Sequence, residues 1–158
     1  SPSAANLQAL RYIISYEPKK NAAIFSHLSW AGYLKEWIGP KEGERPSAYI
    51  VVLGDTRISK NFWCGYGIAA QSILLGAAEL GLGGCMIGSI NKEELRNALD
   101  IPEYYEIHIV IAIGKPKEKV VIEQAKDADD IKYWRDERGV HHVPKRSLDE
   151  IIINNKRG

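Results

Sequence analysis

Runs of apolar residues divide this chain into predicted strands and helices. Four stretches rich in β-branched residues predict strands, at residues 10–16, 48–53, 85–90 and 106–114. Helical spacing predicts a helix over residues 21–37, whose apolar face holds Ile24, Leu28, Ala31 and Leu34. A second helix, residues 62–80, is apolar on nearly all sides and is expected to be central rather than superficial. Together these patterns predict the α+β class, with helices around a sheet of about four strands.

The remaining segments predict shorter elements and one unusual extension. Asn91 is expected to be the N-cap of a short amphipathic helix, with Glu94 at the capping-box position. After Pro116 the chain turns polar and ends in a basic segment, residues 143–150. We expect this extension to lie across its own domain or across a partner, because it has too few apolar residues to form a core. Small residues in the helix at 62–80 would also allow a helix from a second copy to approach closely.

Composition and charge restrict the classes of protein to consider. A chain of 158 residues with 45% hydrophobic and 26% charged residues is expected to form one globular domain, residues 1–158. Its net charge of +1 provides no basic field, so no nucleic-acid partner is expected. Gln71, Glu79 and several glycines argue against a membrane span in residues 67–88. Cys64 and Cys85 lie in apolar surroundings and are expected to be buried, reduced thiols, which favours a cytoplasmic location.

Common motifs for phosphate, metal and nucleophile chemistry do not fit this sequence. A dinucleotide fingerprint starting at Gly81 and Gly83 would require a glycine where Met86 stands, and the element order is helix, turn, strand. No P-loop and no nucleophile elbow is present. The adjacent His141 and His142 would point to opposite faces of a strand without further ligands at metal-site spacing. We therefore expect no metal site and interpret these histidines as solvated loop residues.

Three sets of side chains each allow a structural and a functional interpretation. Ser3, Asn6 and Gln8 beside Pro2 form either a turn cluster or a hydrogen-bonding patch for a polar ring edge or a ribityl-like chain. Lys145 and Arg146, just before Ser147, form either a solvated charge pair at a helix start or a phosphate site. Three aromatic residues of the helix predicted at 21–37 either pack within the protein or form a wall over a flat substrate; these are Trp30, Tyr33 and Trp37. Trp63 is expected in the core or in an interface.

Four segments, taken in order, resemble the FMN-dependent nitroreductase family. Residues 1–8, Ser-Pro-Ser-Ala-Ala-Asn-Leu-Gln, resemble its Pro-Ser-x-x-Asn-x-Gln segment, and residues 67–83 resemble its central helix and glycine turn. Residues 111–116 resemble its last core strand, and residues 143–148 resemble its C-terminal phosphate-binding stretch. The family's N-terminal helix and Arg-x-Ser segment have no counterpart in this sequence, so we expect a shortened member or a fragment.

The resemblance implies a fold and a set of cofactor contacts. The fold is an α/β/α sandwich with a mixed, mostly antiparallel sheet and a C-terminal extension, assembled as an intertwined homodimer with FMN at the interface. The implied cofactor-binding residues are Pro2, Ser3, Asn6, Gln8, Leu82, Gly83, Gly84, Lys145 and Arg146. The first four would reach the partner's cofactor, the glycine turn would lie against the ring, and the two cations would hold the phosphate.

The resemblance also implies an activity. The expected function is an FMN-dependent oxidoreductase that moves electrons from NADH or NADPH to a nitroaromatic, quinone or flavin acceptor. No catalytic side chain is assigned, because the flavin carries the chemistry. The alternatives are a flavin-binding or degenerate dimer without turnover, and a purely structural α+β dimer.

Overall fold

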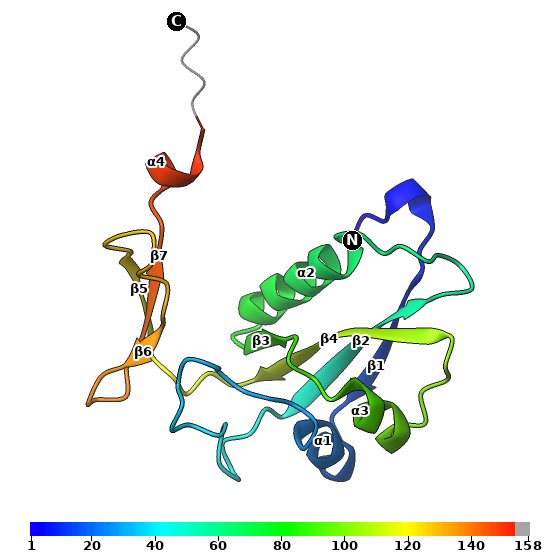
Figure 1. Cartoon of the computed structure of the whole chain (residues 1–158). Coiled ribbons are helices and arrows are strands. Elements are labelled where there is room, and N and C mark those ends of the chain that lie inside the picture. The colour runs from blue at the N-terminus through cyan, green and yellow to red at the C-terminus, as the bar shows by residue number, and fades with distance from the viewer. Residues whose placement is uncertain (154–158) are drawn as a thin grey trace, which may run out of the picture. The chain divides into compact units, whose positions relative to one another are not determined.

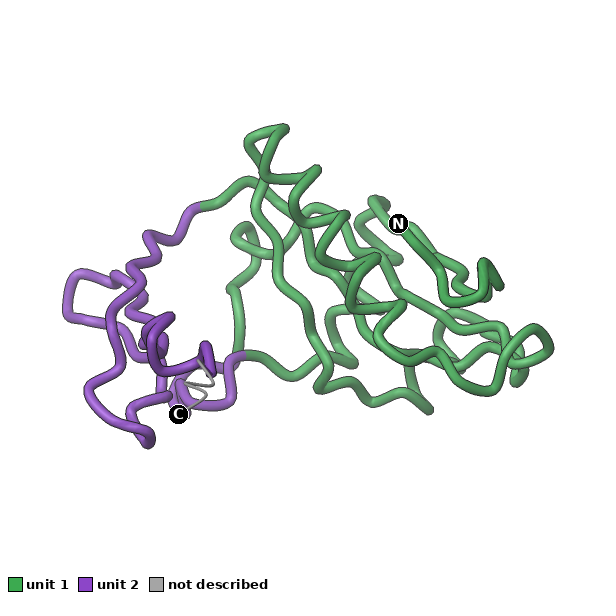
Figure 2. The backbone as a smooth tube through the Cα atoms, turned by 90° about the horizontal axis from the view of Figure 1, so that it is seen from above, with its two compact units in different colours: residues 1–30, 39–116 green, residues 31–38, 117–158 purple. Residues whose placement is uncertain are grey.

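The chain forms two compact units, each of which is described here by itself. The computed structural model describes residues 1–153. Unit 1 holds residues 1–30 and 39–116, and unit 2 holds residues 31–38 and 117–158 (Figure 2). The expectation of a single domain stays a prediction.

Unit 1 is built on a four-stranded antiparallel sheet with the strand order β1-β2-β4-β3. Its elements in chain order are the 3-10 helix η1 (Ala4–Asn6), β1 (Leu10–Ser15), α1 (Pro18–Phe25), β2 (Ala48–Asp55), α2 (Gly65–Glu79), β3 (Gly83–Ile87), α3 (Lys92–Ala98) and β4 (Tyr105–Gly114). All four predicted strands are therefore confirmed. The Asn91 side chain accepts a hydrogen bond from the Glu94 N–H, which confirms the predicted N-cap.

Helices cover both faces of this sheet. Helix α2 lies on one face, and α1 and α3 lie on the other (Figure 1). Strand β2 is buried on both sides: Val51 and Leu53 join the core with α1 and α3, and Val52 joins the core with α2. This alternation follows from the two-residue period of a strand, and burial on both faces explains the continuous apolar run in the sequence.

A β-bulge interrupts the pairing of β2 with β4. Val52 pairs with Ile109 and Leu53 pairs with Ile107, which leaves His108 between them without a partner residue. The extra residue reverses the alternation of side chains along β4, so that both Ile107 and Val110 face the core with α1 and α3. It also directs the His108 ring against Tyr66 of α2, with ring centroids 4.6 Å apart and planes 4° from parallel.

The helix predicted over residues 21–37 is wrong beyond Phe25. Helix α1 ends there because the backbone of the following residues pairs with the segment that precedes α3. The Ser29 N–H donates to the Ser89 carbonyl and the Asn91 N–H donates to the His27 carbonyl, each at 2.9 Å. These long-range hydrogen bonds replace the helical ones, so helical spacing in the sequence was an insufficient signal.

Helix α2 is more exposed in the single chain than its composition predicts. Among its residues only Ala69, Ala70 and Ala77 are buried, whereas Leu75 is 63% exposed. The expectation of a central helix is therefore wrong for one copy of the chain. The expectation of buried thiols is also wrong, because both cysteines of the chain are exposed.

Unit 2 contains a three-stranded sheet with the order β5-β7-β6. Its elements are β5 (Val120–Gln124), β6 (Trp134–Arg135), β7 (His141–Lys145) and the one-turn helix α4 (Leu148–Ile151). The two histidines thus lie in a strand and not in a solvated loop. His141 Nδ1 lies 3.1 Å from the Glu118 carboxylate, and His142 Nδ1 lies 2.6 Å from the Glu123 carboxylate. The Tyr133 ring lies against His141 and the Trp134 ring stacks on His142; these contacts, which a sequence pattern does not reveal, help to cover both imidazoles.

We predict that His108 makes unit 1 less stable at acidic pH. The side chain is only 8% exposed, and its burial lowers the pKa of His108 below the ordinary value despite the nearby Glu106 carboxylate. The unfolded chain therefore binds a proton more readily than the folded chain, and stability falls as the pH drops through about 6.5, the ordinary histidine value. Urea unfolding at pH 7.5 and pH 5.0 measures this loss. His108→Gln should lose less stability over the same interval; equal losses would refute the assignment.

Candidate functional site

The N-terminal segment is a strained turn held by its own polar side chains. The Ser3 Oγ accepts a hydrogen bond from the Gln8 N–H at 2.9 Å, and the Gln8 side-chain amide donates to the Asn6 carbonyl at 3.1 Å. Ala5, Asn6 and Gln8 all have positive φ, at 48°, 53° and 50°. Residues other than glycine adopt this conformation only where the surroundings enforce it, as they often do beside ligands. The sequence-predicted cluster of Ser3, Asn6 and Gln8 is thus brought together.

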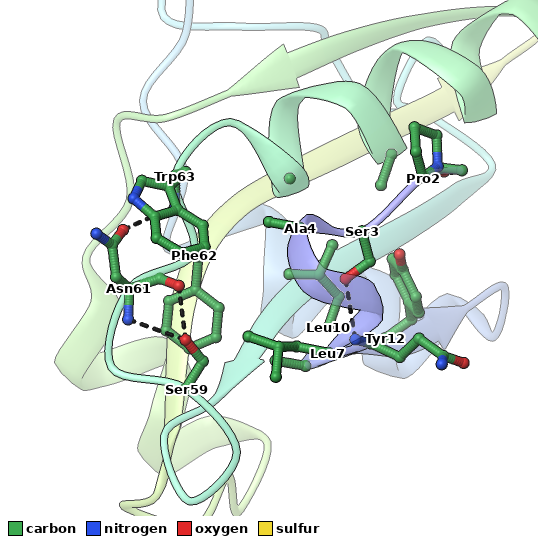
Figure 3. A pocket seen from close by; sticks show the side chains of 15 residues that line it. Pro2, Ser3, Ala4, Leu7, Leu10, Tyr12, Ser59, Asn61, Phe62 and Trp63 are labelled. Atoms are coloured by element: carbon green, nitrogen blue, oxygen red, sulfur yellow. Dashed lines mark hydrogen bonds between the residues drawn. The ribbon is translucent and has the colours of Figure 1, made fainter.

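This segment forms one wall of a cavity of about 200 Å³. Figure 3 shows Pro2, Ser3 and Ala4 on one side and Asn61, Phe62 and Trp63 on the other. The lining residues are Ser1, Pro2, Ser3, Ala4, Leu7, Gln8, Ala9, Leu10, Tyr12, Ser59, Asn61, Phe62, Trp63, Gly65 and Ala69. Sequence reasoning missed the second wall. Trp63 is 57% exposed, so its expected place in the core is wrong, whereas its expected place in an interface stays a prediction. The run Asn61-Phe62-Trp63 just before a helix was the available signal.

The second wall is fixed at its base by an ion pair. Asp55 is only 2% exposed and accepts two hydrogen bonds from the Arg57 guanidinium, at 2.9 and 2.7 Å. These bonds lower the pKa of Asp55 to about 2, so the carboxylate is ionised at neutral pH. The Asp55 carbonyl also accepts hydrogen bonds from the Ile58 and Ser59 N–H groups. The ion pair therefore anchors the start of the loop that carries the cavity residues.

The glycine turn after α2 has a specific structural cause. Gly81 has φ +71°, its N–H donates to the Ala78 carbonyl at 3.0 Å, and the Leu82 N–H donates to the Ala77 carbonyl at 2.9 Å. This pair of bonds is a Schellman motif, in which glycine adopts the left-handed conformation that ends the helix. The Leu82 N–H is therefore already engaged, while its side chain is 37% exposed.

Gly83 and Gly84 are required by packing at the start of β3. A Cβ on Gly83 would lie 3.1 Å from the Pro116 ring, and one on Gly84 would lie 2.4 Å from the Leu74 side chain and 2.9 Å from the Ala112 carbonyl oxygen. Glycine here lets β3 lie close to α2 and β4. The contact of this turn with a flavin ring stays a prediction.

Lys145 and Arg146 belong to unit 2. Lys145 ends β7 and is exposed, whereas the Arg146 guanidinium donates to the Ala128 carbonyl at 2.8 Å and lies 3.4 Å from the Glu150 carboxylate. Ser147 caps α4 by accepting a hydrogen bond from the Glu150 N–H, which confirms the predicted helix start. Arg146 is therefore partly used within the unit, and Lys145 is the more available cation.

The three aromatic residues proposed as a substrate wall do not form a helical stripe. Trp30 lies in unit 1, where its ring is 5.6 Å from that of Phe25. Tyr33 and Trp37 lie in unit 2, where Tyr33 contacts the Tyr133 ring at 5.0 Å and Trp37 lies under the Arg135 guanidinium at 4.4 Å. The predicted stripe is wrong because α1 ends before all three. A role of these residues toward a substrate stays a prediction.

Within residues 1–153 no cluster of His, Cys, Asp and Glu side chains could hold a metal ion. In the same part of the chain no helix is long and apolar enough to cross a membrane.

Comparison with known proteins identifies a family. The nitroreductase family model matches residues 1–115, which confirms the family resemblance; the segment at residues 143–148 lies outside this match. A protein of Archaeoglobus fulgidus named "Putative NADH dehydrogenase/NAD(P)H nitroreductase" is 36% identical over 89 residues, 51% of this chain and 51% of that protein. The chain thus spans about half the length of the curated relative that it matches.

Solved structures share the fold of this chain. A Parabacteroides distasonis protein with the same name as the Archaeoglobus relative has a TM-score of 0.65 at 24% identity, covering 99% of this chain and 78% of that one. An FMN-dependent nitroreductase of Clostridium difficile R20291 has a TM-score of 0.61 at 23% identity, covering 82% and 74%. At these identities the likeness concerns the fold alone, and it confirms the nitroreductase-like α+β fold expected from the sequence.

We predict that Gly84→Ala destabilises unit 1 by about 1–3 kcal/mol, the usual cost of overpacking. The Leu74 side chain can move away from a new methyl group, but the Ala112 carbonyl is held in the β3–β4 ladder. Gly88→Ala is the matched control, because a Cβ there meets nothing within 4 Å. Its unfolding free energy should stay level or rise by up to about 1 kcal/mol. Urea unfolding measures both, and similar values for the two variants would contradict the packing role of Gly84.

Proposed function

Because this chain belongs to the nitroreductase family, we propose that it is an FMN-dependent oxidoreductase that takes electrons from NADH or NADPH and delivers them to a small acceptor. Nitroaromatics, quinones and free flavins are the proposed acceptor classes. The observation that carries the proposal is that the segments assigned to the cofactor are exposed or half-buried and retain polar groups for a ligand. A cytoplasmic location is part of the same proposal.

The donor set of these segments suits the polar parts of FMN. The Ser3 hydroxyl accepts one hydrogen bond and can still donate its own proton. The Asn6 carboxamide is exposed and makes no hydrogen bond to any residue from 1 to 153. Amide and hydroxyl groups of this kind match a ribityl chain and the edge of a flavin ring. Lys145 supplies a cation for the phosphate, and Arg146 can add a charge-assisted hydrogen bond.

When bound, FMN would supply the capacity to accept a hydride from the nicotinamide and to pass electrons to the acceptor. The contribution of this chain would be orientation and electrostatics. The backbone of the glycine turn is half-buried at Gly83 and exposed at Gly84, so a flat ring could approach it. The cations at the phosphate end would offset the ligand's negative charge.

The geometry of α2 supports a cofactor site shared between two copies. The N-terminal segment shares a cavity with Gly65 and Ala69 at the start of α2, whereas the glycine turn follows the last residue of that helix. A helix of 15 residues is about 22 Å long, so one flavin ring cannot lie against both ends within a single chain. A two-fold pairing of antiparallel α2 helices would bring the N-terminal segment of one copy to the glycine turn of the other.

Anaerobic reduction of bound flavin tests the function. Purified protein is incubated with FMN, free flavin is removed, and NADH or NADPH is added without oxygen. We expect the protein to retain about one FMN per chain. The absorbance of this bound flavin should bleach when the nucleotide is added and return when p-nitrobenzamide is added. Bound flavin that does not bleach would identify a flavin-binding protein without turnover. No retained flavin would overturn both interpretations.

The double variant Lys145→Ala/Arg146→Ala adds a binding test to this experiment. Each charge-assisted hydrogen bond contributes about 1.5–3 kcal/mol, so FMN affinity should fall at least about tenfold. The matched control is Lys132→Ala/Arg138→Ala, which removes the same charge from exposed positions of unit 2. Circular dichroism checks that each variant folds. Equal FMN affinities for the two double variants would refute the proposal that Lys145 and Arg146 hold the phosphate.

The exposed face of α2 supports the proposed homodimer. Leu75 is 63% exposed, Ile68 is 38% exposed, and both line a shallow depression together with Gly67 and Gln71. Exposed apolar surface on a helix rich in small residues is suited to close packing against a second helix. A second copy of the same helix would cover this surface and complete the cofactor site at once.

We predict that Leu75→Glu converts the dimer to a monomer, because pairing would bury an unpaired charge. Light scattering after gel filtration should give about twice 17.7 kDa for the wild-type chain and one times that mass for the variant. Asn97→Glu adds the same charge to an exposed position of α3, on the opposite face of the sheet, and should remain dimeric. A monomeric wild-type chain at high micromolar concentration would refute the pairing.

A further inference from the structure

The His108 ring is enclosed by three neighbours in unit 1. It is stacked on the Tyr66 ring of α2, and Phe62 lies edge-on against it, with ring centroids 4.7 Å apart. On the third side lies Gly54 of β2, where a Cβ would lie 2.5 Å from the His108 Nε2 atom and 2.4 Å from the Phe62 ring. The two rings therefore occupy a space that exists only because Gly54 has no side chain.

Phe62 connects this ring to the second wall of the cavity. The wall is formed by Ser59, Asn61, Phe62 and Trp63 (Figure 3). The Trp63 N–H donates to the Asn61 Oδ1 at 2.9 Å, and the Ser59 hydroxyl donates to the Asn61 carbonyl at 2.7 Å. These local hydrogen bonds give the wall its shape, whereas the contact between Phe62 and His108 attaches it to the sheet.

A proton on His108 finds no hydrogen-bond acceptor in this space. The Nε2 atom is buried and makes no hydrogen bond to any residue from 1 to 153. On β4, the Glu106 carboxylate favours a proton but lies 3.8 Å from Nδ1, beyond hydrogen-bond distance. On α3, the charge of Lys92 opposes a proton. On α2, Tyr66 provides the face of an aromatic ring. The remaining neighbours, Phe62 and Gly54, carry no titratable group.

Burial decides between these opposing effects. A cation gains from the face of an aromatic ring, but burying it without a hydrogen-bonded partner costs more. Burial is accordingly the largest influence on His108, and it lowers the pKa of His108 below the ordinary value. A protonated ring is therefore stabilised only if it gains access to water, which requires the ring or the adjacent Phe62 to move.

We propose that His108 is a positioning residue, which holds the second wall of the cavity in place while its ring is neutral and lets the wall move when a proton from solvent binds the ring. The movement does not require unfolding, because His108 has no partner residue in β2 and the sheet loses no pair when the ring shifts. One consequence rests on the proposed function. The opposite wall contains Ser3 and Gln8, which are assigned to FMN, so a displaced second wall should weaken FMN binding at acidic pH.

Fluorescence of Trp63 in the flavin-free chain tests the movement directly. Trp63 follows Phe62, has φ +41° and an exposed side chain, so a shift of the wall should change how acrylamide quenches it. Trp134 is stacked on His142 and can also respond to pH, so the signal of Trp63→Phe is subtracted at each pH. We expect the Trp63 signal to change with a midpoint below about 6.5, the ordinary histidine value, while far-ultraviolet circular dichroism stays constant.

Three variants assign this change to His108. His108→Gln is neutral at every pH and should keep its pH 7.5 signal down to pH 5.5. His108→Ala removes the support of Phe62 and should show at pH 7.5 the signal that the wild-type chain shows at pH 5.5. His27→Gln is the matched control, because it makes the same substitution at another half-buried histidine of unit 1 and should keep the wild-type profile. The two glutamine variants decide the matter if His108→Ala fails to fold.

The affinity for FMN tests the consequence for the proposed cofactor site. The phosphate of FMN also titrates, but it does so equally for every variant, so the ratio of wild-type to His108→Gln affinity isolates the ring. Between pH 7.5 and pH 5.5 this ratio should fall at least about threefold, as expected if fewer than about a third of the wild-type molecules keep the wall in place. A constant ratio would refute this consequence.

The outcomes distinguish the role of His108 from the proposed function. A Trp63 signal that does not depend on pH, or a change that persists in His108→Gln, would overturn the positioning role. Loss of circular dichroism with the same midpoint would also overturn it, because the chain would then unfold as a whole. Bleaching of FMN by NADH in these cases would leave the oxidoreductase proposal standing. A His108-dependent Trp63 signal in a chain that retains no FMN would support the positioning role and overturn the proposed function.

Discussion

The unpaired residue in β4 determines how both faces of the sheet of unit 1 are filled. Because His108 has no partner in β2, the alternation of side chains changes along β4, and Ile107 and Val110 reach the same core. The bulge also directs an imidazole toward α2, where Tyr66 and Phe62 pack on it. Gly54 leaves the space that these rings occupy. The loop that carries Asn61 and Trp63 is therefore positioned by a feature of the sheet as well as by its own local hydrogen bonds.

Helix α2 connects the two halves of the candidate site and also keeps them apart. Its first turns line the cavity with the N-terminal segment, and its last turn runs through a Schellman motif into β3. Because the helix has 15 residues, its two ends are too far apart for one flavin ring to contact both. The same helix leaves apolar side chains exposed, Leu75 above all. Pairing of two copies would resolve both features, which is why the cofactor proposal and the dimer proposal depend on one another.

Sequence patterns were reliable where burial alone decides the structure. The β-branched runs of β2 and β4 have buried residues on both faces of the sheet, which is typical of central strands. The Asn91 cap was also predictable, because its hydrogen bond to Glu94 is local. Local spacing failed for residues 26–37, because residues 27–29 form backbone hydrogen bonds to residues 89–91 and the helix ends before them. It failed for Cys64 and Cys85 as well, since apolar neighbours in sequence do not imply burial in space.

The sequence by itself determined the α+β class, the strand positions, the glycine turn and the polar set of Ser3, Asn6 and Gln8, because each depends on residues close together in the chain. Only the tertiary structure decided the bulge at His108, the outward turn of Trp63 and the place of the cavity between residues 1–12 and 59–69. These features arise from contacts between segments about 50 residues apart, such as Phe62 against His108. Local propensity contains no information on which distant side chains will share a space, and packing supplies it.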